Sequence, residues 1–338
     1  MARVTLMDVA QHCQVSRATV SLVLRDSPLV ADATRERVKQ GMKDLGYVYN
    51  RAAASLRTQR SDAIGVVLTQ INNPYFAEFA AGLQDVLGES GVVPLLGVSN
   101  EDREQQARIT QSLVERGVDG IVMIPAHGTV AEDLPNLLGT PLVLMARKMP
   151  GAAADYVGAV NHAGASAAAE HLYEHGCRRI AFLGGFTDSS ARQERFGGVS
   201  QFLAGKGLDI PAELAPECPP LRPDSYRAAL ALLQGQQVDG VICFNDVVAF
   251  GLLDALADLD IAVGSQIRVI GFDDVHEAVH SRPSLSSVAV PARETGRRAA
   301  RIVLERAKGL TAEPIHEELP TQLRTRETCG CPRPTPSA

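Results

Sequence analysis

Residues 4–24 read VTLMDVAQHCQVSRATVSLVL and contain two short apolar-periodic runs separated by a turn. In the first run, Leu6 and Val9 lie on one stripe of a helix. Thr5 comes just before this run and Asp8 three residues later, which is a capping-box arrangement. Two helices so close in sequence must cross steeply. The spacing therefore predicts a helix pair that presents its second member to a DNA major groove.

The second run carries the candidate base-reading side chains. Ser16 is a candidate N-cap, and Val20 can face the first helix. Arg17, Ala18 and Leu22 are then left on the outer face. A recognition helix reads bases mainly through its first turns, where arginine can bond to guanine and apolar groups can touch the thymine methyl. On the helices alone, the alternative is an amphipathic helix pair with no role in DNA binding.

The charge distribution favours the DNA interpretation. The first 60 residues hold ten basic and five acidic side chains, so their net charge is +5. The whole chain has a net charge of −6, which leaves −11 on the remainder. A basic head on an acidic body is expected when one end of a chain meets phosphates and the rest must stay soluble.

A third helix and a short hinge follow the helix pair. The apolar stripe in residues 32–45 predicts a helix that completes a three-helix head over residues 1–46. Within residues 47–60, Asn50 can cap a short alanine-rich helix that carries Leu56 beside Arg57. An apolar wedge flanked by arginine suits minor-groove insertion, and a plain helical linker is the alternative.

Length and composition set broad limits on the rest of the chain. At 338 residues and 45% hydrophobic content, two or three domains with real cores are expected. The lack of an apolar run near 18 residues and of a secretory h-region predicts a cytoplasmic protein with no membrane partner. The six cysteines lack zinc-like pair spacing. Cys329 and Cys331 could bind metal or be oxidised, but we expect a disordered tail over 329–338, and no metal or cofactor.

Beyond residue 60 the sequence alternates apolar strand runs with amphipathic helices. Such strands imply an α/β fold with two doubly wound parallel sheets, each covered on both faces. We expect one subdomain of about 61–160 plus 291–325, another of about 161–290, and a cleft between them. The expected strands are 63–69, 92–98, 120–124, 142–145, 156–160, 179–183, 238–244 and 268–270, and the expected helices are 76–87, 101–116, 162–174, 192–205, 223–233, 247–259 and 291–308.

Polar side chains follow the predicted strands, where ligands bind in open α/β sheets. Asparagine, aspartate, serine and arginine supply the donors and acceptors that a polyol needs, and arginine can also grip a carboxylate. Asn245 and Asp246 have a structural alternative as helix caps, and Asp273 as a loop cap or ion-pair partner. The candidate ligand-binding residues are Asn73, Tyr75, Arg147, Ser190, Arg195, Asn245, Asp246 and Asp273.

Enzyme interpretations find little support. G-x-S-x-G, P-loop and H-E-x-x-H motifs do not occur, and Gly184-Gly185 is only a fragment of a dinucleotide fingerprint. The eight histidines are scattered, without a nucleophile arranged beside them. We therefore expect a protein that is not an enzyme.

Residues 4–57 resemble the DNA-binding head and hinge of the LacI/GalR family of bacterial repressors. The shared pattern is Thr5-Leu6, Asp8-Val9-Ala10, Val15-Ser16, Thr19-Val20-Ser21, Leu45-Gly46-Tyr47, Asn50, Ala53 and Leu56. The resemblance implies that residues 17, 18 and 22 read major-groove bases. It also implies that paired hinge helices wedge Leu56 into the minor groove. One departure is Gln14, where the family usually has glycine; a positive φ there would cost about 1 kcal/mol.

Residues 61–328 resemble the periplasmic-binding-protein-like effector domain of the same family. The signatures are Asn73-Pro74-Tyr75-Phe76, Gly117-Val118-Asp119-Gly120, Arg195-Phe196-Gly197-Gly198, residues 245–251, Gly271-Phe272-Asp273-Asp274 and residues 291–296. The resemblance places Arg195, Asn245 and Asp273 at ligand-binding positions, and with them Arg147 and Asn73. The aromatic residue often found near 218–221 is missing, because this chain has Cys218-Pro219-Pro220-Leu221 and no tryptophan.

Taken together, these features predict a sequence-specific transcription regulator of carbohydrate-metabolism genes, and a repressor in particular. A sugar or sugar-acid effector would control it allosterically. We expect a homodimer on a near-palindromic double-stranded DNA operator, because the chain's tail has no heptads for a tetramer. A nucleobase-responsive regulator and a solute-binding protein for transport are the alternatives. The side chains expected to contact DNA are Thr5, Ser16, Arg17, Ala18, Thr19, Ser21, Leu22, Asn50, Ala53, Leu56 and Arg57.

Overall fold

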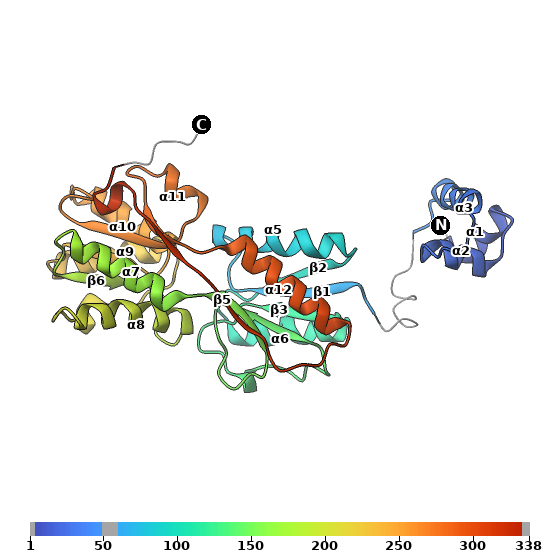
Figure 1. The fold of residues 1–338 in the computed structure, drawn as a ribbon, viewed down its shortest axis with the longest axis horizontal. Coiled ribbons are helices and arrows are strands. Elements are labelled where there is room, and N and C mark those ends of the chain that lie inside the picture. The colour runs from blue at the N-terminus through green and yellow to red at the C-terminus, as the bar shows by residue number, and fades with distance from the viewer. Residues whose placement is uncertain (1–3, 49–59, 333–338) are drawn as a thin grey trace. The chain divides into compact units, whose positions relative to one another are not determined.

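The computed structural model describes residues 4–48 and 60–332, and the chain divides into two compact units at Ser61. The first unit is a three-helix head built from α1 (Leu6–His12), α2 (Arg17–Leu24) and α3 (Asp32–Asp44) (Figure 1). The hinge residues predicted to contact DNA lie outside the described residues; they are Asn50, Ala53, Leu56 and Arg57.

The first two helices begin at the N-cap side chains that the sequence predicts, Thr5 and Ser16. The Thr5 backbone N–H donates to the Asp8 carboxylate over 2.7 Å, and the Asp8 N–H donates to the Thr5 hydroxyl over 3.3 Å. The capping box is therefore confirmed, with aspartate in place of the usual glutamate. Ser16 caps α2 by accepting from the Thr19 N–H over 3.0 Å. Gln14, in the turn between the helices, has φ +51°, a left-handed conformation that costs a non-glycine residue about 1 kcal/mol.

The second unit contains two sheets. The first is wholly parallel, with strand order β10-β5-β4-β3-β1-β2. Its helices are α5 (Pro74–Glu89), α6 (Arg103–Glu115) and α12 (Ala292–Ala307). Its strands are β1 (Ala63–Leu68), β2 (Val93–Val98), β3 (Gly120–Met123), β4 (Leu142–Met145), β5 (Asp155–Ala159) and β10 (His316–Leu319).

Alternation along the strands separates two apolar cores, one on each face of this sheet. On β1, Val66 packs in the core shared with α5 and α12, whereas Val67 packs with Leu113 of α6. The period of two is what a strand buried on both faces requires. On one face, α5 and α12 lie side by side, and Gly82 permits the contact because a Cβ there would strike the Arg293 carbonyl (Figure 1).

The second sheet has the order β11-β9-β8-β7-β6, parallel except for the antiparallel edge pair β11–β9. Three 3₁₀ turns, η1 (Ala131–Asp133), η2 (Ala212–Leu214) and η3 (Glu327–Cys329), join elements of the unit. The strands are β6 (Ile180–Leu183), β7 (Gly240–Cys243), β8 (Arg268–Asp273), β9 (Ser286–Ala289) and β11 (Gln322–Arg324). The helices are α7 (Asn161–Glu174), α8 (Ser190–Ala204), α9 (Arg222–Gly235), α10 (Asp246–Asp258) and α11 (His276–His280).

The chain passes between the two sheets after β5, before α12 and after β10. As expected from the sequence, α12 returns to the first sheet, and β10 adds a strand to it. The segment of about 291–325 that we expected on the first sheet extends too far, because β11 pairs with β9 and so lies on the second sheet. Among the described residues, no helix is long and apolar enough to cross a membrane.

The prediction of a disordered tail from residue 329 onward is wrong for Cys329. Cys329 ends η3 and has no exposed surface, and its N–H donates to the Ser286 hydroxyl over 3.2 Å. The short run of sequence after residue 325 gave no periodic signal, so the packing of this turn against β8 and β9 was not foreseen.

Candidate functional site

A cavity lies between the two sheets of the second unit. Its walls come from the carboxyl ends of parallel strands in both sheets, which is where open α/β sheets bind ligands. The lining residues are Thr69, Gln70, Asn73, Tyr75, Phe76, Glu101, Ile124, Ala146, Arg147, Ala191, Arg195, Pro220, Phe244, Asn245 and Asp273.

Arg147 follows β4, as predicted, and lines the cavity next to Glu101. Two hydrogen bonds of 2.8 and 2.9 Å join its guanidinium to the Glu101 carboxylate, and both side chains are only 8% exposed. A third bond of 3.1 Å runs to the Pro125 carbonyl. Because the charge of Arg147 is matched by a buried carboxylate, this arginine adds no net positive charge to the cavity.

Arg195 projects from α8 into the cavity and is held by three polar groups. Its Nε donates to Asn161 Oδ1 over 2.9 Å, and Nη1 donates to the Phe244 carbonyl over 2.6 Å. Its Nη2 lies 3.6 Å from Asp273 Oδ1. The guanidinium also lies 3.7 Å from the centroid of the Phe272 ring, which is cation–π geometry. This arginine, predicted to bind a ligand, is therefore fixed in one orientation before any ligand arrives.

Asp273, the last residue of β8, is buried and has φ +108°. Burial raises the pKa of Asp273 to about 7, although the nearby Arg195 guanidinium lowers it. Burial and the Asp273 carboxylate also raise the pKa of Tyr75 well above its ordinary value. Glu101 and Ala146 share a positive φ at other strand ends around the cavity. Backbone conformations of this kind are held in place at functional sites.

Asn73 and Asn245 each line the cavity and also cap a helix, and for Asn245 the cap was the predicted structural alternative. Asn73 Oδ1 accepts from the Tyr75 N–H over 3.0 Å at the start of α5. Asn245 Oδ1 accepts from the Val248 N–H over 3.0 Å at the start of α10. Their amide nitrogens remain for a ligand, since each cap uses only the side-chain oxygen.

Two further predicted residues lie away from the cavity wall. The Asp246 carboxylate accepts from the Ser287 hydroxyl over 2.6 Å and from the Val275 N–H over 2.9 Å. These bonds join the start of α10 to β9 and to the segment after β8. Burial raises the pKa of Asp246 well above its ordinary value. Ser190 lines a neighbouring pocket, where its hydroxyl accepts from the Lys148 N–H over 2.8 Å.

Sequence reasoning missed several residues of the cavity. Glu101 lies three residues beyond the end of β2, at the start of the helix expected over 101–116. Asn161, which orients Arg195, directly follows the strand expected at 156–160, so its place after a strand end was a usable signal. Tyr75, Phe76 and Phe244 supply the aromatic faces of the cavity. The 218–221 segment, where the family often has an aromatic residue, contributes Pro220 to the lining. Aromatic faces beside amide and carboxylate groups suit a sugar ring, whose C–H faces and hydroxyls need both.

The head presents the predicted base-reading face of α2. Arg17 and Ala18 are exposed and Leu22 is half-buried, while Val20 and Val23 pack in the head core. Thr19 and Ser21 are half-buried and already have partners, Thr19 with the Ser16 hydroxyl over 2.9 Å and Ser21 with Arg25. Thr5 remains exposed at the start of α1. The first turn of α2 is therefore open to a partner.

Two family models match the chain. One, described as "Bacterial regulatory proteins, lacI family", matches residues 5–50. The other, described as "Periplasmic binding protein-like domain", matches residues 169–329. The two matches correspond to the head and to the larger part of the second unit.

Curated relatives match over nearly the whole chain. The HTH-type transcriptional regulator CelR of Thermobifida fusca is 33% identical over 96% of this chain and 98% of its own length. The maltose regulon regulatory protein MalI of Escherichia coli K12 is 33% identical over 87% of this chain and 90% of its own. The ribose operon repressor of Halalkalibacterium halodurans is 29% identical and covers 96% of each chain.

Solved structures of transcription regulators are also similar to this chain. A complex of the transcriptional regulator CelR with cellobiose has a TM-score of 0.72 and 32% identity, covering 96% of this chain and 100% of that one. The lac repressor dimer bound to operator and an anti-inducer has a TM-score of 0.86 and 22% identity, covering 97% and 99%. The second likeness bears on the fold alone.

Proposed function

Because this chain belongs to the lacI family of bacterial regulatory proteins, we propose that it represses carbohydrate-utilisation genes under the control of a neutral sugar. The observation that carries the proposal is the pairing of Arg147 with Glu101, a buried carboxylate that matches its charge. A guanidinium that is already matched gives the carboxylate of a sugar acid no uncompensated partner on this wall of the cavity. A neutral polyol can instead share the existing donors and acceptors.

The aromatic and amide groups favour a sugar over the alternatives. Phe76 and Phe244 offer apolar faces, and Asn73 and Asn245 keep amide donors beside them. Cellobiose is the ligand of CelR in its solved complex. We therefore propose a mono- or disaccharide as the effector, with a purine as the principal competitor.

The DNA-binding part of the proposal rests on the head. Arg17 and Ala18, at the exposed start of α2, would meet base edges in the major groove of a double-stranded operator. We propose a homodimer acting in the bacterial cytoplasm on a near-palindromic site, since two heads related by a two-fold axis read two half-sites. Effector binding must favour one arrangement of the two sheets over another to change operator affinity.

Thermal unfolding of the full chain in the presence of single compounds tests the effector class. The panel holds neutral sugars (glucose, cellobiose, maltose, ribose), sugar acids (gluconate, glucuronate) and purines (guanine, hypoxanthine). A raised midpoint with a neutral sugar, and a matching change in operator affinity, is the expected result. Stabilisation by purines alone or by sugar acids alone would overturn the proposed effector.

A salt titration tests the DNA interpretation separately. Affinity for a duplex should fall steeply as salt rises, because bound phosphates release counterions. The isolated residues 62–338, which lack the basic head, serve as the control and should bind no DNA. An affinity that does not depend on salt would overturn the DNA-binding role without bearing on the effector.

A further inference from the structure

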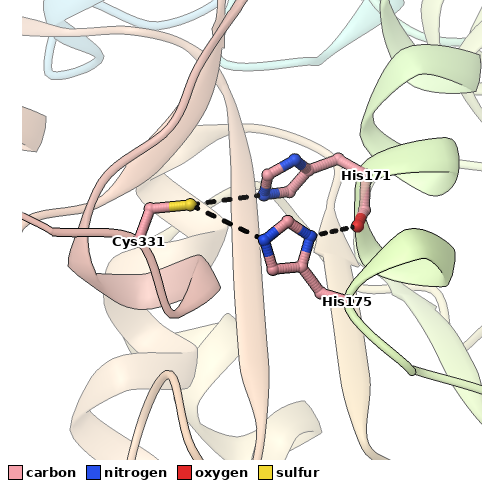
Figure 2. Close-up of side chains that lie close together, drawn as sticks. All are labelled: His171, His175 and Cys331. Atoms are coloured by element: carbon pink, nitrogen blue, oxygen red, sulfur yellow. Dashed lines mark hydrogen bonds between the residues drawn. The ribbon is translucent and has the colours of Figure 1, made fainter.

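Two histidines and a cysteine converge at the far end of α7 (Figure 2). His171 lies in the last turn of the helix and His175 is its C-cap, so their spacing of four places both on one face. The Cys331 Sγ lies 3.9 Å from His171 Nε2 and 3.8 Å from His175 Nε2. The three ligand atoms lie within 4.8 Å of one another, and this is the one such cluster among residues 4–48 and 60–332.

The rings are oriented as metal ligands are. The His175 Nδ1 lies 2.8 Å from the His171 carbonyl and donates to it, because a carbonyl oxygen only accepts (Figure 2). This bond places the ring proton on Nδ1 and leaves the lone pair of Nε2 directed at the Cys331 sulfur. Metal-bound histidines commonly have their second nitrogen bonded to a carbonyl in this way.

The terminal segment is fixed in place without help from the histidines. Thr328 donates its hydroxyl proton to the Val269 carbonyl over 2.8 Å and accepts from the Ser286 N–H over 2.8 Å. Gly330, at φ +86°, turns the chain, and the Cys331 N–H returns to the Arg326 carbonyl over 3.3 Å. The Cys331 sulfur is thereby presented to α7 on a short, hydrogen-bonded turn.

We propose that His171, His175 and Cys331 form a binding site for a thiophilic d¹⁰ cation such as Zn²⁺. Two imidazoles and a thiolate are a preferred donor set for this ion. Tetrahedral zinc would separate a sulfur and a nitrogen ligand by about 3.6 Å. The two observed S···N distances exceed that separation by only a few tenths of an ångström.

Cys329 adjoins the cluster and is the candidate for the fourth ligand. It is fully buried, and hydrogen bonds connect its sulfur with His171 and with Cys331. A fourth protein ligand would complete a closed tetrahedral site of the kind that structural zinc occupies.

The location gives the site a structural consequence. A cation held here would tie the end of the described chain to α7, whose first residue, Asn161, orients Arg195 in the cavity. Bound metal should therefore stabilise the second unit, because the ligands converge only in the folded chain. Uptake should release the Cys331 proton, so apparent affinity should rise with pH.

The test uses the full chain, purified under reducing conditions and freed of metal with a chelator. Zn²⁺ titrated calorimetrically should bind one equivalent at this site, and Co²⁺ in its place should give a thiolate-to-cobalt charge-transfer band. Cys331→Ser and His175→Ala should each weaken Zn²⁺ binding at least about 100-fold, since loss of an outer-shell partner alone costs 10–100-fold. Both side chains have solvent exposure, so the variants should fold.

The matched control is His280→Ala. His276 and His280 have the same four-residue spacing on α11, with ring centroids 4.6 Å apart, but no third ligand joins them. Removing His280 should change neither the Zn²⁺ affinity nor the zinc-dependent rise in the unfolding midpoint. The proposal is overturned if Cys331→Ser binds zinc as tightly as the parent chain, or if cobalt gives no thiolate band. A Cys329–Cys331 disulfide that resists the reducing agent would also overturn the proposal.

Discussion

Arg147 and Glu101 face each other across two parallel hydrogen bonds of 2.8 and 2.9 Å on the wall of the cavity. The two residues lie in the segments that follow β4 and β2, at the same edge of the sheet, although β3 and β1 separate those two strands. Their pairing makes this wall neutral while keeping a guanidinium beside the ligand. We therefore expect the charge that a ligand can carry to depend on Glu101 as much as on Arg147.

Replacing Glu101 with glutamine should shift ligand preference toward sugar acids. Glu101→Gln keeps a hydrogen-bonding group but leaves the buried charge of Arg147 unmatched, so a ligand carboxylate can take the place of the lost one. We expect the affinity ratio of gluconate to glucose-type ligands to rise about tenfold or more, with a lower unfolding midpoint in the absence of ligand. Isothermal titration with matched sugar and sugar-acid pairs measures the ratio.

The control for this variant is Glu104→Gln, which breaks an exposed ion pair with Arg108 on α6. Exposed pairs contribute little, so this change should alter neither preference nor stability measurably. An unchanged ratio in Glu101→Gln would show that the charge of this wall does not select the ligand.

Arg195→Ala should abolish the response to effector while operator affinity without effector stays near that of the parent. The guanidinium is fixed by Asn161, Phe244 and Asp273 inside the cavity, whereas the DNA-binding head is a separate unit. Fluorescence anisotropy of a labelled operator, with and without effector, measures both quantities. Arg222→Ala, which removes an exposed arginine paired with Asp254, is the control and should respond normally. A full response in Arg195→Ala would rule out its proposed role.

Asp273 should make the stability of the second unit depend on pH. Its pKa is raised by burial from 3.8 to about 7 in the folded chain. The folded state therefore holds this proton more tightly than the unfolded state does. That contribution to stability is complete below about pH 4 and is lost as pH rises through 7, a change on the order of 4 kcal/mol.

Asp273→Asn removes this proton, so the variant should gain stability relative to the parent as pH rises from 4 to 7. Urea unfolding at several pH values measures the difference. Burial and the charge of Asp273 both raise the pKa of Asp246, so the comparison is repeated in an Asp246→Asn background. A constant difference between the two proteins across this range would mean that Asp273 does not titrate there.

Local signals in the sequence predicted most of the architecture. Strand alternation and helical stripes located the main elements of both sheets, and the caps at Thr5 and Ser16 followed from residue type and spacing alone. The short elements β9, β10, β11 and α11 were not predicted. These elements lack the continuous apolar runs that identified the equally short β3, β4, β6 and β7, and the three strands among them are fixed by pairing with other strands.

The difference between local signals and distant contacts also explains which residues of the cavity and of the histidine–cysteine cluster could be predicted. Residues that follow a strand, such as Arg147 and Asn245, could be proposed because strand ends gather at one edge of a sheet. The partners Glu101 and Asn161 meet their arginines only through tertiary packing. The two sulfurs at 329 and 331 were read as tail residues, because their histidine neighbours lie about 160 positions earlier in the sequence.

The turn of the head carries a removable strain. Gln14 has φ +51°, where glycine is free of the Cβ penalty. Gln14→Gly should stabilise the isolated residues 1–61 by about 0.5–1 kcal/mol, less than the full penalty because glycine also gains freedom in the unfolded chain. Thermal unfolding followed by circular dichroism measures the change. Gln11→Gly, within α1, should instead destabilise the head.

Arg17 should determine the preference for one base pair of the operator. It is exposed in the first turn of α2, where a guanidinium can bond to both acceptors of a guanine. Arg17→Ala should reduce discrimination at a single operator position by about 1–3 kcal/mol and lower the salt slope by at most about 1. Lys39→Ala removes an exposed charge from α3 and should leave base preference unchanged. Binding to a library of single-base operator variants distinguishes the two, because a phosphate contact weakens all sequences equally and a base contact weakens one position.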